Sequence, residues 1–431
     1  MNSFEASNSI NSNSTYHQRI FYVIFVTHFV TLVISSYMEF KLGVITLAAN
    51  VLTTALLIFL GNVPWKNSGN GMLTLFIVWG VFCFAEILNP NHVQEAWNIA
   101  ITYYFVYPII CAIVVPVAIR KIAHIEWLLK IWSVFIIFGA IRGYIQMNYG
   151  FNTIELQFLF ERGGASTHII WSGIRYFSYF TDAANFGVHM AMGILVYGIS
   201  FFYVKSNFLK IYFAFVVVAA IYGMGISGTR SSIAVPLGGL LFMVVLSRNW
   251  NGLFLSMFAF IGLFFFFRFT TIGNSNEYIR KMRSAFTPEE DASYNVRVVN
   301  REKIKEYLAD KPFGYGLGLG GKAERFNPKE VLPIPPDSWL VNVWADTGVV
   351  GLVLYVLIHV ILFAWCSWIL MFQLTNKRLR GLLNAWLCVN AGFFISAYTN
   401  DVMQYPNSII VFTGFALCFA GPYIEKEESQ N

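Results

Sequence analysis

Residues 347–371 read Thr347-Gly-Val-Val-Gly-Leu-Val-Leu-Tyr-Val-Leu-Ile-His-Val-Ile-Leu-Phe-Ala-Trp-Cys-Ser-Trp-Ile-Leu-Met371, without one Asp, Glu, Lys or Arg. A helix needs about 20 predominantly apolar residues to cross the hydrocarbon layer of a membrane. The whole chain has this character, because hydrophobic residues make up 57% of it and charged residues only 12%. Soluble proteins average roughly 25% charged residues. The stretch therefore indicates a membrane protein.

Similar apolar stretches recur along the chain, and we predict about twelve transmembrane helices. Helices are expected because backbone groups in lipid must be hydrogen-bonded within their own segment, and the alternating pattern of a membrane β-barrel is missing. The predicted fold class is an all-α polytopic membrane protein, with a single transmembrane domain over residues 1–431. The predicted spans lie near residues 20–36, 42–60, 71–89, 99–119, 127–147, 183–203, 209–226, 231–246, 251–267, 347–371, 380–398 and 407–423.

The lysines and arginines of the short connections indicate which side each connection faces, since cytoplasmic loops are richer in them. With the N-terminus in the cytoplasm, the outer connections 89–98 and 399–405 hold no Lys or Arg, and the remaining outer ones hold Lys41, Arg162, Arg175 and Arg230. The inner connections hold Lys66, Arg120, Lys121, Lys205, Arg248, Lys377, Arg378 and Arg380. The bias fits this orientation and leaves the outer arginines to be explained.

One long polar segment, residues 269–336, interrupts the spans between the ninth and the tenth, and we expect it to form a large, partly helical periplasmic loop. Within it, residues 294–309 have the composition of a helix. Arg297, Arg301 and Lys305 recur there every four residues, so they are predicted to line one helical face with positive charge. A folded, charged segment in a protein made of membrane spans suggests contact with a substrate.

A glycine-rich run, Lys311-Pro-Phe-Gly-Tyr-Gly-Leu-Gly-Leu-Gly-Gly321, follows the predicted helix and ends it. Because glycine has no Cβ, Gly316 and Gly318 are expected to let the backbone approach a bound substrate closely. A flexible loop is the alternative. The run does not follow a strand, as the glycines of a dinucleotide-binding motif would.

Arg175, Arg230 and Arg297 all lie on the outer side, against the orientation bias. The planar guanidinium group binds two phosphate oxygens at once. At a lipid interface the obvious anion is the phosphate or diphosphate of a lipid carrier. The structural alternative for each arginine is a side chain that reaches toward the interface, or that pairs with a nearby carboxylate.

Asp337 is the candidate catalytic base, because it stands where the polar loop returns to the membrane. A carboxylate there can accept the proton of a hydroxyl nucleophile. The alternative is that Asp337 caps the helix that begins at Ser338. His168 is the one histidine of the outer connections placed to compete as a base, whereas Asp346 lies deeper and is expected to be structural.

Several motifs are missing from the sequence, and their absence narrows the chemistry. There is no phosphate-binding loop of the Walker type, no His-Glu-x-x-His zinc pattern and no paired-Asp metal motif. We therefore predict no metal and no cofactor, and a net charge of +6 over so many spans gives no reason to expect nucleic acid. The cysteines fall inside predicted spans without metal-ligand spacing and are expected to be buried apolar residues; they are Cys83, Cys111, Cys366, Cys388 and Cys418.

Two strings of the polar segment and its return to the membrane resemble a known family. Arg297 precedes the turn Pro312-Phe-Gly-Tyr-Gly316 by some fifteen positions, and the return reads Asp337-Ser-Trp-Leu-Val-Asn-Val-Trp-Ala-Asp-Thr-Gly348. Together they resemble the O-antigen ligase and O-antigen polymerase superfamily of bacterial envelope glycosyltransferases. The string Ser-Gly-Thr-Arg230-Ser and the Arg175, Asp182, Asn185 segment are similar to that family's pattern as well.

The resemblance implies a GT-C-like, metal-independent enzyme at the periplasmic face of the bacterial inner membrane. Its donor would be a glycan on undecaprenyl diphosphate, and its acceptor a lipid A core or a growing glycan. Arg230 and Arg297 would hold the diphosphate, and Arg175 would assist. In many ligases of the family a histidine opens the return string, whereas this chain has Asp337. The resemblance also implies substrate contacts for Arg175, Arg301, Asp182, Asn185, Gly316, Gly318 and Ser338.

Three alternatives stay open at this point. Ligation and polymerisation need the same donor site and differ in the acceptor, although the shared strings favour the name ligase. A non-enzymatic flippase or exporter of lipid-linked oligosaccharide would need a charged cavity near the middle of the membrane. A purely structural partner of envelope assembly would leave the outer arginines unexplained.

Overall fold

The computed structural model describes residues 65–170, 173–247, 250–275, 279–280, 283, 292–321, 323–404 and 406–430. The predicted spans 20–36 and 42–60 therefore lie outside the described residues. Every other predicted span coincides with a helix, and nine helical stretches of the described residues are long and apolar enough to cross a membrane. The prediction of an all-α polytopic membrane protein is confirmed.

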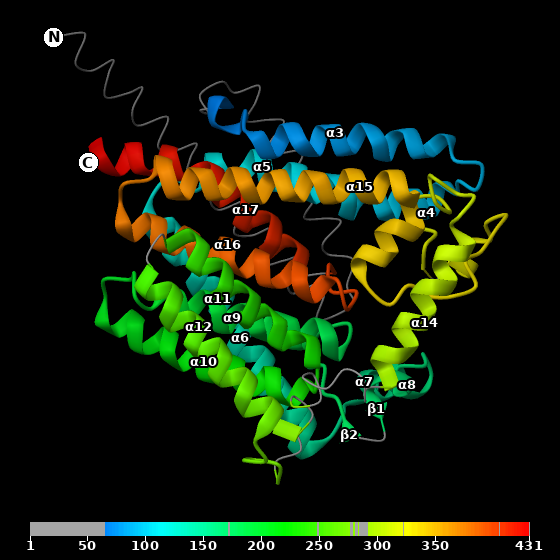
Figure 1. The fold of residues 1–431 in the computed structure, drawn as a ribbon, viewed down its shortest axis with the longest axis horizontal. Coiled ribbons are helices and arrows are strands. Elements are labelled where there is room, and N and C mark those ends of the chain that lie inside the picture. Colours follow the sequence, from blue (N-terminus) through cyan, green and yellow to red (C-terminus); the bar gives the residue numbers. More distant parts are fainter. Residues whose placement is uncertain are drawn as a thin grey trace.

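The long helices run side by side through the molecule, and successive ones point in opposite directions (Figure 1). The described parts of residues 150–182, 228–233, 270–338 and 398–406 gather at one end of the bundle, which we call the loop side. The other end, where the last helix finishes, is called the C-terminal side. The long helices are α3 (Gly71–Ala85), α5 (Tyr107–Ala118), α6 (Ile122–Tyr149), α9 (Ala183–Ser200), α10 (Asn207–Ser227), α11 (Ala234–Ser247), α12 (Trp250–Phe269), α15 (Trp339–Trp368), α16 (Lys377–Ala397) and α17 (Asn407–Gln430).

Shorter elements connect these helices, most of them on the loop side. The strands β1 (Ile169–Ile170) and β2 (Gly173–Ile174) pair as an antiparallel ribbon, with Ile169 opposite Ile174. The short helices are η1 (Trp65–Ser68), η2 (Glu86–Leu88), α4 (Gln94–Ile101), η3 (Thr102–Val106), α7 (Thr153–Phe160), α8 (Ala165–His168), η4 (Arg230–Ile233), α14 (Ala292–Tyr307), η7 (Ala323–Phe326) and η8 (Ile369–Gln373). Of these, α14 is the helix predicted at 294–309.

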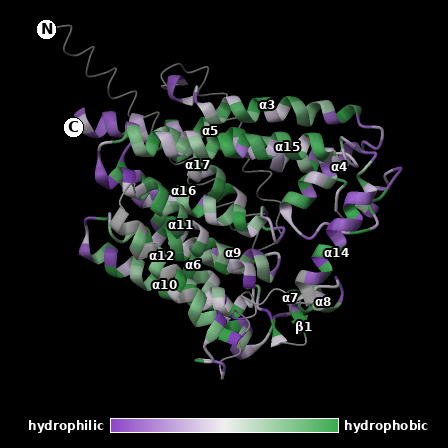
Figure 2. Cartoon of the chain, viewed as in Figure 1, coloured by the Kyte–Doolittle hydropathy of each residue, from purple (hydrophilic) through white to green (hydrophobic). Residues whose placement is uncertain are grey.

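The packing is centred on α16, which contacts α9, α11 and α17. Small residues allow the close approach, since a Cβ added at Gly392 of α16 would lie 2.0 Å from the carbonyl oxygen of Val235 in α11. The outer helices instead turn apolar side chains such as Val81, Phe215 and Val360 outward, where each is more than half exposed. Figure 2 shows the apolar residues along the helices and the hydrophilic ones mainly at the two ends. This is the distribution that a bilayer requires.

The helix α15 begins at Trp339, eight residues before the predicted span, and changes direction at Gly348. Gly348 has φ of +65° and ψ of −169°, a backbone conformation that is essentially restricted to glycine. The segment Trp339–Thr347 therefore belongs to the loop side, and the membrane-crossing part of α15 follows the break. This break brings the residues before Trp339 back onto the bundle.

Candidate functional site

The loop between α16 and α17, residues 398–401, contacts four segments that carry predicted site residues. Arg301 donates to the Tyr398 carbonyl oxygen (2.8 Å), Arg297 to Asn400 Oδ1 (3.0 Å), the Trp339 N–H to the Asn400 carbonyl oxygen (3.2 Å), Asn185 Nδ2 to the Asp401 carbonyl oxygen (3.3 Å), and Asn400 Nδ2 to Ser231 Oγ. Segments far apart in the sequence thus meet within residues 398–401, at Tyr398, Asn400 and Asp401. We call these residues the 398–401 loop.

Arg175 lies close enough to Arg230 and Arg297, the two other arginines predicted from the orientation bias, for their charges to act on it. Burial is the main cause that lowers the pKa of the Arg175 guanidinium below its ordinary value, and the positive charges of Arg230 and Arg297 lower this pKa further. The Asp182 carboxylate acts in the opposite sense. Arginine nevertheless stays protonated in proteins. Arg175 therefore lies within electrostatic reach of Arg230, Arg297 and the Asp182 carboxylate.

The hydrogen bonds of Arg175 go to neutral oxygen atoms. Its Nη2 donates to Thr229 Oγ1 at 2.9 Å and its Nη1 to the Thr167 carbonyl oxygen at 3.3 Å. Within the part of the chain that the structure describes, the buried Nε atoms of Arg175 and Arg301 have no hydrogen-bond partner. A buried donor is usually paired in a folded protein, so these two N–H groups are available to an acceptor; among the described residues, the Nε atoms of Arg120 and Arg378 at the other end of the bundle are unpartnered as well.

One face of α14 is attached to the bundle turn by turn. Arg297 reaches Asn400, Asn300 reaches Asp337, and Arg301 lies with its guanidinium carbon 4.4 Å from the centre of the Tyr398 ring. The prediction of a charged face over Arg297, Arg301 and Lys305 holds for the two arginines, whereas Lys305 is exposed. Positions four apart rotate about 40° around a helix of 3.6 residues per turn, so the third member turns toward solvent.

Asp337 is half-buried and accepts a hydrogen bond from Asn300 Nδ2 at 2.8 Å. The cap of α15 is Ser338, whose hydroxyl accepts from the Val341 N–H at 3.4 Å. The structural alternative for Asp337, that it caps this helix, therefore does not describe the arrangement. The carboxylate instead faces α14, the helix that carries Arg297. A substrate contact for Ser338 stays a prediction, since its buried side chain serves the helix.

Asp182 and Asn185, predicted to contact substrate, begin a chain of hydrogen bonds that enters the membrane core. Asp182 caps α9 by accepting from the N–H groups of Ala184 and Asn185. The side-chain contacts run from Trp132 Nε1 to His189 Nε2 (3.0 Å), from His189 Nδ1 to Asn407 Oδ1 (3.0 Å), from Asn407 Nδ2 to Asn185 Oδ1 (3.1 Å) and from Asn185 Nδ2 to Asp182 Oδ2 (2.7 Å). Indole donates only, so every donor in the chain points toward the carboxylate. This network holds Asp182 as an acceptor beside Arg175.

His168 has a structural position. Its side chain is 2% exposed, its Nε2 accepts from the Ala183 N–H at 3.1 Å, and its Nδ1 donates to the Gly164 carbonyl oxygen at 2.9 Å. Burial lowers the pKa of this imidazole below its ordinary value. Both ring nitrogens are thus used to attach α8 to the start of α9.

The glycine-rich run packs against protein backbone. A Cβ added at Gly348 would lie 2.1 Å from the Pro312 carbonyl oxygen, and one added at Gly318 would lie 2.5 Å from the Ala96 carbonyl oxygen. The N–H of Gly316 donates to the Asp346 carbonyl oxygen at 3.0 Å. The missing side chains therefore allow the run to sit on the break in α15 and on α4. Contacts of Gly316 and Gly318 with a substrate stay predictions.

Asp346 holds the end of the glycine-rich run against α15. Its buried carboxylate accepts from the Gly320 N–H at 2.5 Å and from the Tyr104 hydroxyl at 3.0 Å. These bonds join α15, η3 and the end of the glycine run. The expected structural role of Asp346 agrees with this geometry.

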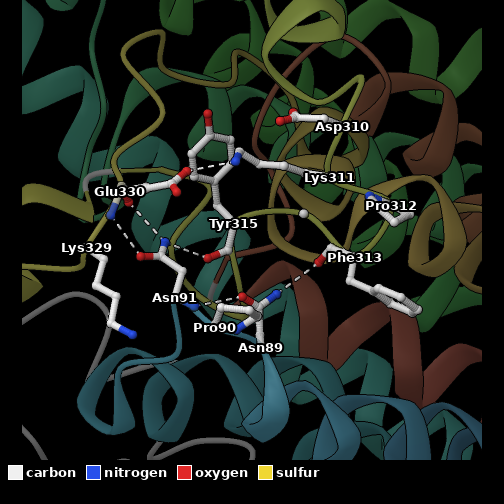
Figure 3. A pocket seen from close by; sticks show the side chains of 11 residues that line it. Asn89, Pro90, Asn91, Asp310, Lys311, Pro312, Phe313, Tyr315, Lys329 and Glu330 are labelled. Carbon is white, nitrogen blue, oxygen red and sulfur yellow. Dashed lines mark hydrogen bonds and ion pairs between the residues drawn. The ribbon is translucent and has the colours of Figure 1, made fainter.

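A pocket of about 330 Å³ lies elsewhere on the loop side (Figure 3). It lies between the connection from α3 to α4 and two parts of the long loop, residues 310–315 and 329–330. Asn91 donates across it to the carbonyl oxygens of Tyr315 (2.8 Å) and Glu330 (3.0 Å), and Lys311 Nζ lies 2.7 Å from a Glu330 carboxylate oxygen. None of the predicted site residues lines this pocket. Its polar groups largely bind one another, so we assign it to the folding of the loop.

Sequence analysis missed the 398–401 loop. It has no Lys or Arg, and for that reason it only counted toward the orientation bias. One signal was present, namely four consecutive polar or aromatic residues, Tyr398-Thr-Asn-Asp401, with Gln404 close behind, between two apolar spans. Gln404 donates to Asp401 Oδ2 at 3.0 Å and accepts from Thr181 at 3.1 Å.

Comparison with known families agrees with the resemblance noted in the sequence. Residues 215–356 match the family described as O-antigen ligase. This match supports membership of the O-antigen ligase and polymerase superfamily, and it indicates activity of that general type. No match was found among the curated proteins.

The matched range covers only part of the site. It contains Arg230, Arg297, Arg301 and Asp337, but neither Arg175 and Asp182 nor the 398–401 loop. Two parts of the chain outside the matched range therefore contribute residues to the described site. One is the start of α9, and the other is the connection between α16 and α17. The connection between α16 and α17 bonds Arg297 and Arg301, and the start of α9 accepts a hydrogen bond from Thr229, the residue before Arg230.

Proposed function

We propose that this protein is a glycosyltransferase that moves a glycan from undecaprenyl diphosphate to an acceptor at the periplasmic face of the inner membrane. The observation that carries the proposal is the convergence of three arginines: Arg175 donates to Thr229, the residue before Arg230, and Asn400 bonds both Arg297 and the residue after Arg230. Grouping like charges costs free energy unless an anion balances them. A diphosphate that joins an apolar polyprenol to a polar sugar lies at the membrane surface, so it is the anion that suits the end of a membrane span.

The arginines supply what this reaction requires from its leaving group. As the bond from the anomeric carbon to the phosphate oxygen breaks, that oxygen keeps the electron pair and negative charge grows on the diphosphate. Guanidinium groups held in place before the reaction stabilise this charge without reorganisation. The orphaned Nε donors of Arg175 and Arg301 add two directed hydrogen bonds to the same end of the substrate. The proposal therefore needs neither a metal nor a nucleotide.

Asp337 is the proposed general base. An acceptor hydroxyl would give its proton to this carboxylate while the hydroxyl oxygen attacks the anomeric carbon from the side opposite the diphosphate, so the product would have inverted configuration. Asn300 donates to one carboxylate oxygen, which leaves the other for the acceptor. Because Asn300 and Arg297 are one turn apart on α14, the base and the diphosphate site are held by the same helix.

The proposal is tested with the full-length protein, purified in detergent or returned to vesicles, and a radiolabelled lipid-linked glycan. We expect transfer to an acceptor glycolipid in the presence of a metal chelator and without nucleotide. Arg230→Ala should reduce the rate about 100- to 1,000-fold, while insertion and thermal unfolding stay as in the wild type. An Arg230→Ala protein that folds normally and keeps full activity would remove the diphosphate assignment.

The same assay separates the competing functions. A flippase or exporter would change the side of the vesicle on which the labelled lipid is found and would leave the glycan on its carrier. Within the transferase class, a ladder of lengthening products would indicate a polymerase, and a single transfer to a lipid A core a ligase. Transport without any transferred product would contradict the proposal.

A further inference from the structure

We infer that Asn400 is a positioning residue, one that sets the distance between the two arginines proposed to hold the diphosphate. The inference rests on the proposed function and extends it to a residue outside the family-matched range. Asn400 lies between α14, which carries Arg297, and η4, which begins with Arg230. Its side chain is bonded to both elements.

The orientation of the Asn400 amide is determined by its partners. Arginine can only donate, so the atom that faces Arg297 at 3.0 Å is the amide oxygen. The amide nitrogen is then left to donate to Ser231 Oγ. The two halves of one small, planar group thus join the residue after Arg230 to the guanidinium of Arg297.

The backbone of Asn400 fixes this amide in place. Its N–H donates to the Ser396 carbonyl oxygen at 3.0 Å, at the end of α16, and its carbonyl oxygen accepts from the Trp339 N–H at 3.2 Å. Trp339 is the first residue of α15, two positions after Asp337. The residue therefore touches α16, α15, α14 and η4, the elements around the proposed reaction.

No other common side chain reproduces both contacts. Aspartate would keep an acceptor for Arg297 but would lose the donor for Ser231 and place a negative charge beside the arginine. Glutamine has the same groups on a side chain one methylene longer, and alanine has neither group. The arginine would keep its charge in each case, so the loss would appear as misplacement. A misplacement of about 1 Å can reduce a rate by about 100-fold.

The test is a double-mutant cycle with Asn400→Ala and Arg297→Ala, measured on the full-length protein by glycan transfer and by the binding of inorganic pyrophosphate. We expect Asn400→Ala alone to reduce transfer about 10- to 100-fold and to weaken pyrophosphate binding. In the Arg297→Ala background it should change either quantity less than about twofold, because Asn400 acts through Arg297. Asn400→Asp should recover part of the loss.

The control is Asn98→Ala, which removes an exposed asparagine of α4 on the loop side whose amide oxygen accepts only from Gln94 in the described contacts. It should leave transfer and binding unchanged. Thermal unfolding of every variant identifies those that fail to fold. If Asn400→Ala fails to fold, Asn400→Gln, which keeps the amide group, replaces it in the cycle.

Each outcome supports or contradicts the positioning role of Asn400, the proposed function, or both. Losses that multiply in the double variant, or an Asn400→Ala protein with normal transfer and binding, would overturn the positioning role. A wild-type protein that binds pyrophosphate but transfers no glycan would end the proposed function, and the binding cycle would still decide on Asn400. A wild-type protein without pyrophosphate binding would end both the arginine assignment and the role of Asn400.

Discussion

Arginines occur at both ends of the bundle, but their partners differ. On the C-terminal side Arg378 lies 2.5 Å from a carboxylate oxygen of Glu126, and Arg120 pairs with Glu427. On the loop side the described hydrogen bonds of Arg175, Arg297 and Arg301 go to hydroxyl, amide and carbonyl oxygens. Neutral acceptors orient a guanidinium group without cancelling its charge. The comparison fits the proposal that the loop side holds an anion, whereas ion pairs join the helices at the C-terminal side.

The carboxylates differ in the same way. Glu126 is paired with an arginine, whereas Asp337 is held by the amide of Asn300. Two described loop-side ion pairs follow the pattern of the other end: Arg142 and Glu155, 2.6 Å apart, attach α7 to α6, and Lys311 and Glu330, 2.7 Å apart, join two parts of the long loop. Pairing therefore marks scaffold, and neutral contacts mark the proposed site.

The largest effect is expected when one arginine from each end is changed. Arg297→Ala should reduce glycan transfer about 100- to 1,000-fold, since a charge that stabilises the leaving group is lost, with little change in thermal unfolding. Arg378→Ala should leave the rate per folded molecule unchanged and lower the free energy of unfolding by about 2 kcal/mol, because Glu126 stays behind partly buried without its partner. Rate assays and thermal unfolding are measured on both. If Arg297→Ala and Arg378→Ala changed the transfer rate and the free energy of unfolding to the same extent, the distinction between the two ends of the bundle would be contradicted.

Asp337→Asn should reduce the turnover number about 100- to 1,000-fold, because an amide does not accept a proton as a general base does. The donor KM should change little, since the diphosphate contacts remain. Ser338→Ala, at the next residue, should lower the free energy of unfolding by about 1 kcal/mol through loss of the helix cap, an effect that Asp337→Asn should not show. A fully active Asp337→Asn enzyme would move the base to another residue.

Gly348→Ala examines whether the scaffold of the loop side depends on the break in α15. The new Cβ would lie 2.1 Å from the Pro312 carbonyl oxygen in a backbone conformation that alanine rarely adopts. We expect the free energy of unfolding to fall by about 2–3 kcal/mol. Gly262→Ala in α12, where an added Cβ meets nothing within 4 Å, should be neutral or slightly stabilising. Thermal unfolding of the two variants measures the difference.

The smallest effect concerns His168, whose pKa is lowered by burial in the folded protein. The unfolded chain has the ordinary pKa of about 6.5, so the unfolded state binds the proton more readily. Stability should therefore be unaffected above that pH and decrease as the pH falls below about 6.5 toward the folded pKa. Thermal unfolding between pH 7.5 and 5 should show a shallower decrease for His168→Gln than for the wild type. Identical slopes would contradict this assignment.

Much of the fold could be predicted because a membrane span is a local property of the sequence. Apolar length alone located the described helices, and the spacing of Arg297 and Arg301 located α14 and its inward face. The exceptions to the charge bias, Arg175 and Arg230, lie at the same end of the bundle as Arg297. These signals depend on composition and period, which neighbouring residues determine.

The rest depends on contacts between distant segments. Both Asp337 and Ser338 are good helix caps, and only the structure distinguishes the capping Ser338 from the Asp337 that faces Asn300. The glycine run suggested a ligand cradle, yet its closest neighbours are Ala96 and Gly348. The 398–401 loop had no charge pattern to draw attention to it, because its function is to accept hydrogen bonds from residues elsewhere in the chain.

The hydrogen bond between Arg297 and Asn400 joins residues that are 103 positions apart in the chain. Arg297 lies inside the family-matched range, and Asn400 lies outside it. A chimera that exchanges residues 215–356 between two such enzymes would combine one parent's guanidinium with the other parent's amide. Activity in such hybrids should return when the connection between α16 and α17 is taken from the same parent. In aligned relatives, the two positions should co-vary for the same reason.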